Sequence, residues 1–83
     1  MNTMVKNQRR NLYMMLKTQA EAEKAKALLT LDLLTSNAAG IGDHSTGDYY
    51  KNANEALTML VDANDKLGAL ETWYKETSPD KLV

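Results

Sequence analysis

The chain has 83 residues, no cysteine and a formal net charge of −1. This length allows one domain with a small core, which in proteins of this size is often completed by association with other chains. The lack of cysteine excludes disulfides, a thiolate nucleophile and cysteine metal sites, and the near-zero net charge disfavours nucleic-acid binding by the whole surface.

The first expected element is a long helix over about residues 3–38. This segment has no glycine and no proline and is rich in Leu, Met, Ala, Lys, Glu and Gln, which are strong helix formers. Its apolar residues recur on two roughly opposite faces. One face holds Leu12, Leu16, Ala20, Ala27, Leu31, Leu34 and Ala38. The other face holds Met4, Met15, Ala22, Leu29 and Leu33.

A turn is expected over residues 39–47. The segment Gly40–Asp48 contains three of the four glycines and the only histidine. Gly40 suits the left-handed position that ends a helix. Ser45 precedes Asp48 by three residues, which is typical of a capped helix start. The turn therefore divides the chain into two helices and predicts a hairpin.

The second helix is expected over about residues 48–76, followed by a short tail over 77–83. Ser78-Pro79 stops the helical pattern. Its apolar residues alternate at spacings of four and three, as in a coiled-coil seam. The members of this seam are Tyr49, Ala53, Ala56, Leu60, Ala63, Leu67, Leu70 and Tyr74. Gly68 lies beside the seam, where it either permits a close helix approach or is simply tolerated.

The two-faced first helix predicts an oligomer, because one hairpin partner covers only one of its faces. The expected fold is all-α: two long antiparallel helices in a single domain, which completes a helical bundle as a dimer or higher homo-oligomer. Off-seam Met59 and Trp73 suggest a further contact patch, although Trp73 could instead fold against the first helix near Met4 and Val5. The expected oligomer or partner interface comprises Met15, Ala22, Leu29, Leu33, Met59 and Trp73.

An alternative function is the binding of a small anionic ligand, such as a signalling nucleotide, at residues 40–50. Backbone amides at a helix start attract anions, the tyrosines could stack on a base, and a neighbouring chain could supply basic groups. The residues of this candidate site are Gly42, His44, Ser45, Tyr49 and Tyr50, with Arg9, Arg10 and Lys17 from the neighbour. The competing interpretation is purely structural: the glycines form a turn, the polar residues cap the helix and Tyr49 begins the seam.

Motifs for catalysis or metal binding are lacking, so we expect no enzyme activity, no cofactor and no metal. His44, Asp43 and Asp48 form at most a weak metal pattern, because such loop residues usually cap helices. A basic cluster at residues 6–10 makes nucleic-acid binding through the first helix a weaker alternative. The sequence has neither a signal-peptide core nor a membrane-spanning run, and we expect a cytoplasmic protein.

The turn Gly40-Ile41-Gly42-Asp43-His44-Ser45, with the helix that follows it, resembles a group of small bacteriophage proteins of unknown function. Those proteins have a helix, a GIGEHS-D-like turn and an acidic helix that ends in an A-x-x-K-L-x-x-L pattern, similar to residues 63–70 here. The similarity covers about residues 28–74, and this chain departs from it by inserting Thr46-Gly47 and by its longer basic first helix. The resemblance implies a helical hairpin and a phage accessory protein, and it transfers no activity to any residue here. The expected function is therefore non-enzymatic binding that scaffolds, inhibits or sequesters a host or phage component, in the host-cell cytoplasm if the protein is phage-encoded.

Overall fold

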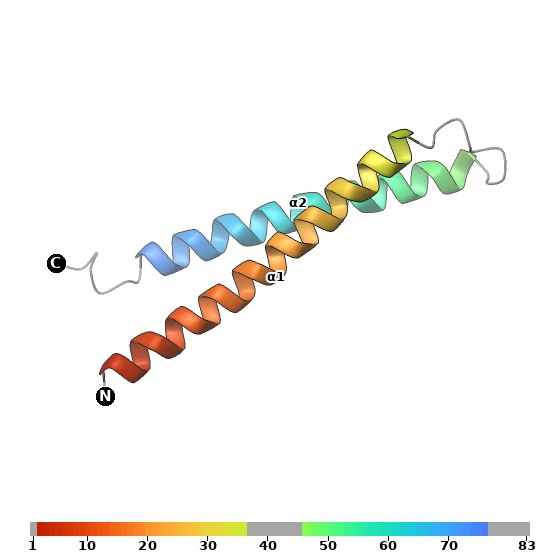
Figure 1. The fold of residues 1–83 in the computed structure, drawn as a ribbon. Helices are drawn as coiled ribbons and strands as arrows, with labels where there is room; N and C mark the ends of the chain where they lie inside the picture. The colour runs from red at the N-terminus through yellow and green to blue at the C-terminus, as the bar shows by residue number, and fades with distance from the viewer. Residues whose placement is uncertain (1, 37–45, 77–83) are drawn as a thin grey trace.

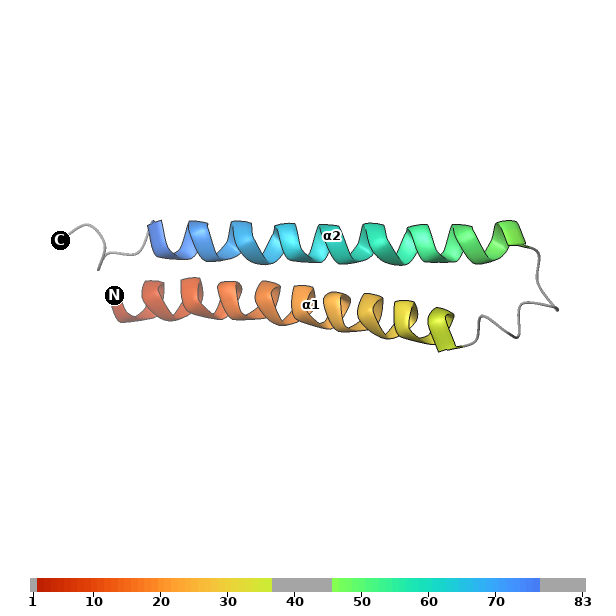
Figure 2. The same ribbon diagram turned by 90° about the horizontal axis from the view of Figure 1, so that it is seen from above.

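The computed structural model is a hairpin of two long antiparallel helices (Figures 1 and 2). It describes residues 2–36 and 46–76, with side chains over 7–36 and 47–75. Helix α1 spans Asn2–Ser36 and helix α2 spans Thr46–Glu76. These described residues contain no strand, and the expected all-α hairpin is confirmed.

The helix bounds differ from the expected ones by one or two residues at three of the four ends. Helix α2 begins at Thr46, so the last two residues of the expected turn belong to the helix. Gly40, the expected helix end, lies outside the described residues. Both helices are long because their sequences favour helix throughout: α1 has 35 residues and α2 has 31, and neither contains proline.

Alanines form the buried centre of the hairpin. Ala20, Ala27, Ala56 and Ala63 are at most 4% exposed, and no larger side chain within the described residues is fully buried. Two alanines on each helix, seven residues apart, allow the backbones to approach closely where the helices cross in Figure 1. The seam expected for α2 is confirmed, because all eight of its members are buried or half-buried.

Larger side chains fill the space toward the two ends of the hairpin. Near the start of α1, the ring of Tyr13 stacks on Tyr74 with centroids 4.1 Å apart. Near the opposite end, the Tyr49 hydroxyl donates a hydrogen bond to the Leu34 carbonyl over 3.3 Å. That carbonyl belongs to the last turn of α1, where backbone acceptors lack partners within the helix. The aromatic residues thus tie the helices together beyond the alanine centre.

The packed face of α1 differs from the expected one. Leu12 is 46% exposed, and Tyr13 takes the seam position instead. Glu23 and Thr30 are half-buried along this seam and Lys17 and Lys24 are half-buried beside it, where the sequence pattern placed no polar residue. Leu16, Ala20, Ala27, Leu31 and Leu34 do lie in the packed face, as expected, and Ala38 lies outside the described residues.

Candidate binding surfaces

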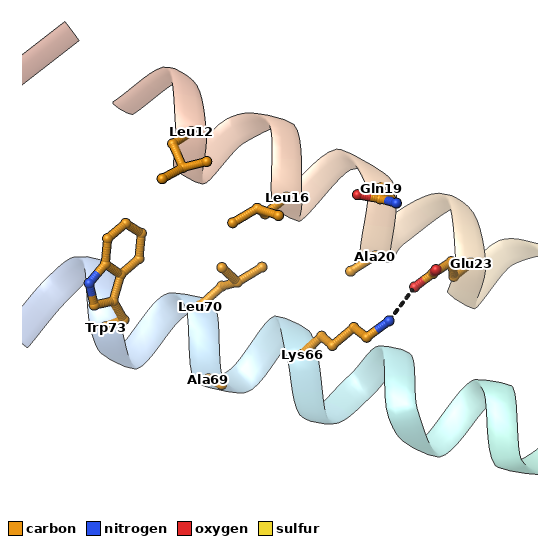
Figure 3. A pocket seen from close by; sticks show the side chains of 9 residues that line it. All are labelled: Leu12, Leu16, Gln19, Ala20, Glu23, Lys66, Ala69, Leu70 and Trp73. Carbon is orange, nitrogen blue, oxygen red and sulfur yellow. Dashed lines mark hydrogen bonds and ion pairs between the residues drawn. The ribbon is translucent and has the colours of Figure 1, made fainter. Parts of the chain in front are cut away.

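An apolar hollow of about 500 Å³ opens between the helices toward the start of α1. In Figure 3 the side chains of Leu12, Leu16 and Leu70 converge on it, with Trp73 at one end. The ion pair between Lys66 and Glu23 marks its other end, with the nitrogen and oxygen 3.1 Å apart. The small side chain of Ala20 leaves this space between the helices, and the leucines line the space without filling it.

A second, smaller hollow of about 260 Å³ continues along the same face. It shares Glu23 and Lys66 with the first hollow, and its other lining residues are Glu55, Thr58, Met59 and Asp62. The two hollows define one broad face of the hairpin, which we call the groove face. Its larger hollow is apolar, and its smaller hollow carries carboxylates.

Arg9 holds the end of α2 against α1. Its Nη2 donates hydrogen bonds to the carbonyl oxygens of Trp73 (3.2 Å) and Tyr74 (3.3 Å). The guanidinium carbon also lies 4.9 Å from the ring centroids of both residues, within the range of a cation–π interaction. A positive charge at a helix C-terminus is favourable, because the last carbonyls carry partial negative charge.

The opposite broad face, which we call the back face, is marked by Lys17 and Glu71. Lys17 approaches the Tyr13 ring to 5.8 Å. The pKa of Glu71 is lowered first by its hydrogen bond with Lys75, whose nitrogen lies 2.6 Å from the carboxylate, then by the charge of Lys75, and to a smaller extent by Lys17. Glu71 conversely raises the pKa of Lys75. The Glu71 and Lys75 side chains are exposed, so their ion pair contributes little to holding the fold together.

The expected interface residues of α1 lie on the surface of the single chain. Met15, Leu29 and Leu33 are more than half exposed, with Leu29 at 58%, and Ala22 is exposed as well. The expected second apolar face of α1 therefore exists and is not covered by α2. The expected contact patch on α2 is only partly exposed. Met59 is half-buried in the smaller hollow, whereas Trp73 keeps 36% of its surface exposed. The Trp73 ring contacts Arg9 of α1 and lines the larger hollow.

The candidate anion-site residues are not brought together within one chain. Arg9, Arg10 and Lys17 lie in the first half of α1, at the end of the hairpin remote from Tyr49 and Tyr50 (Figure 1). Arg9 already binds the end of α2, and Tyr49 is half-buried in the seam, whereas Tyr50 is 60% exposed. Gly42, His44 and Ser45 lie outside the described residues. Assembly of this site would require a second copy of the chain.

The sequence pattern did not assign Leu57 to any surface, and it marked Val61 only as lying off the seam. Both are about half exposed on α2. The recurrence of Leu57 and Val61 at helical spacing from Tyr50 was a signal that could have identified a second apolar row on α2.

Comparison with known proteins found no matching family model, no matching curated protein and no matching solved structure. Neither described helix has an apolar stretch long enough to cross a membrane. Among the described residues, no three His, Cys, Asp or Glu side chains are grouped so that they could hold a metal ion.

Proposed function

We propose that this protein is a non-enzymatic binding protein that acts as a homo-oligomer. The observation that supports this proposal is the exposed apolar row on α1, where Met15, Leu29 and Leu33 are more than half exposed while the buried core consists of four alanines. Each alanine buries little apolar surface compared with a leucine. Covering the outer row with a second copy would supply the burial that a core of this size lacks.

The biological role that fits best is that of a phage-type accessory protein in the host cytoplasm, which scaffolds, inhibits or sequesters a host or phage protein. This part of the proposal rests on the resemblance of the 40–45 turn and the following helix to small phage proteins. The exposed Trp73 beside the apolar hollow suits contact with such a partner, since aromatic side chains are enriched where proteins bind one another.

Sedimentation velocity on the wild-type chain tests the oligomer directly. We expect a species of at least twice the mass of the 9.3 kDa chain at micromolar concentration. A compact monomer with full helicity under these conditions would refute the proposal. The variant Leu29→Glu places a charge in the exposed row and should shift the population toward monomer, whereas Ala25→Glu adds the same charge at an exposed position outside the row and should not.

A small anionic ligand at residues 40–50 is a second candidate, supported by the exposed ring of Tyr50 near the start of α2. A thermal-shift screen with nucleotides tests it. A ligand present at 100 times its Kd should add about 2.7 kcal/mol of stability, and Tyr50→Ala should remove that gain. A flat response across a broad nucleotide panel would rule out this candidate.

A further inference from the structure

The groove face combines an apolar row on α1 with an acidic row on α2. On α1, residues that share the face of Leu12 recur every three or four positions. The apolar members of this row are Leu12, Met15, Ala22, Leu29 and Leu33, and Gln19 and Lys26 lie between them. On α2, Asp48, Glu55 and Asp62 are seven residues apart and therefore share one side, and the last two line the smaller hollow.

The back face has a basic row on α1, with exposed Met14 and Leu28 beside it, and an apolar row on α2. Lys17 lies near enough to Glu71 for its charge to lower the pKa of that carboxyl slightly, and Arg10 and Lys24 stand seven residues before and after Lys17. On α2, Val61 precedes Glu71 by ten residues, close to three helical turns, so the two share this side. The exposed apolar residues of α2 on the back face are Tyr50, Leu57 and Val61.

We infer that the groove face of one copy docks on the back face of a second copy of this chain, a conclusion that rests on the proposed homo-oligomer. In this arrangement α1 of one copy lies over α2 of the next, and apolar row meets apolar row. At the same time α2 of the first copy lies over α1 of the next, so that the acidic row meets the basic row. Both charged rows repeat every seven residues, about 10.5 Å along a helix, so at least two pairs can form in one register.

The helices as wholes show the same complementarity. Helix α1 carries six basic and three acidic residues, whereas α2 carries three basic and six acidic residues. Pairing α1 with α2 between copies therefore sets unlike charges against each other, which favours this pairing over like with like.

A two-fold dimer through the groove face fits less well. Its symmetry would place the acidic row of one copy against either the acidic row or the apolar row of the other. It would also leave Leu57 and Val61 on the back face exposed. The contact between groove face and back face joins two different surfaces, so it is heterologous and repeats until it closes into a ring or extends as a filament.

Blocking one face at a time tests this inference. Leu29→Glu should block the groove face, and Leu57→Glu should block the back face. Each variant alone should sediment as a monomer, because its one intact face has no intact counterpart. An equimolar mixture should form a 1:1 dimer and stop there, through the groove face of the Leu57→Glu chain and the back face of the Leu29→Glu chain.

The result that overturns the inference is a Leu57→Glu variant that assembles like the wild type, or a mixture that stays monomeric. If the wild-type chain is still oligomeric in that case, only the proposed pairing fails. If the wild-type chain is itself a monomer, the proposed homo-oligomer fails with it. Ala25→Glu is the matched control and should assemble like the wild type.

A charge exchange tests the same contact at two exposed positions of α2 and two half-buried lysines of α1, and the helicity of each variant is measured as a control for folding. The variant Glu55→Lys/Asp62→Lys reverses the acidic row, and Lys17→Glu/Lys24→Glu reverses the basic row. Each should weaken self-association at least tenfold at low salt. An equimolar mixture of the two should recover assembly, because the groove face of each variant then meets a back face of opposite charge; the two reversals combined in one chain should do the same. The combined chain should recover wild-type assembly; equal weakening in the combined chain would overturn the inference.

Discussion

Arg9 and Trp73 are 64 residues apart in the sequence, yet the Arg9 guanidinium donates a hydrogen bond to the Trp73 carbonyl and lies 4.9 Å from its ring. The same group donates to the Tyr74 carbonyl. One side chain therefore satisfies two acceptors in the last turns of α2 and also joins α2 to α1. Few other described interactions link the open end of the hairpin, apart from the stacking of Tyr13 on Tyr74.

Arg9→Lys should lower the free energy of unfolding by about 1 kcal/mol, even though it keeps the charge. Lysine lacks the planar fork that serves two carbonyls and stacks on two rings. Urea unfolding at a fixed chain concentration measures the loss. Asn7→Ala, at an exposed neighbouring position, should change stability little. Equal stability of Arg9→Lys and wild type would show that the two hydrogen bonds contribute nothing.

Tyr49→Phe should cost about 0.5–1.5 kcal/mol of stability, because it removes the hydroxyl that donates to the Leu34 carbonyl and leaves that acceptor without its partner. Tyr50→Phe is the matched control, since the neighbouring ring is 60% exposed. Thermal or urea unfolding of the pair separates the two effects. A loss of the same size in Tyr50→Phe would contradict the assignment.

The sequence predicted α2 better than α1, and the reason lies in the seam residues. All eight seam positions of α2 are apolar or aromatic, so the pattern is visible without a structure. On α1 the seam includes Glu23 and Thr30, which a hydrophobic pattern rejects. Both are accommodated by specific bonds: Glu23 pairs with Lys66 across the helices, and the Thr30 hydroxyl donates to the Lys26 carbonyl.

The binding surfaces were only partly predictable for a different reason. Helical spacing alone identified Met15, Leu29 and Leu33 as residues that α2 would not cover. Whether Leu57 and Val61 lie on the same broad face or on the opposite one depends on how α2 is rotated against α1. That rotation is set by contacts between residues far apart in sequence, such as Tyr13 with Tyr74 and Glu23 with Lys66, which periodicity within one helix does not report.

Gly68→Ala should raise the free energy of unfolding by about 0.5–1 kcal/mol. A Cβ added at Gly68 meets nothing within 4 Å, so the glycine does not permit a close helix approach within the chain, and its helix-propensity cost is recovered by alanine. Ala69→Gly, at the next exposed position, should lower stability by a similar amount. A destabilised Gly68→Ala variant that also loses self-association would instead indicate a close contact with another copy.

The pKa of Glu71 should be lower in the wild-type chain than in the variant Lys75→Ala. The hydrogen bond and charge of Lys75 favour the ionised carboxylate and lower its pKa. The stabilisation from this pair is therefore present at neutral pH and is lost as the pH falls through the pKa of folded Glu71. NMR titration of the Glu71 side chain in wild type and in Lys75→Ala measures the shift, and Lys51→Ala should leave the midpoint unchanged.

Ala63→Leu should destabilise the hairpin by about 1–3 kcal/mol. Ala63 is fully buried at the centre of α2, and a leucine there must push the helices apart or adopt a strained rotamer. Ala25→Leu adds the same atoms at an exposed position of α1 and should stay within about 0.5 kcal/mol of wild type. Urea unfolding at one chain concentration compares them. If Ala63→Leu proved more stable than wild type, the helices would have room for a larger side chain, and the close approach at the alanines would not be what holds the hairpin together.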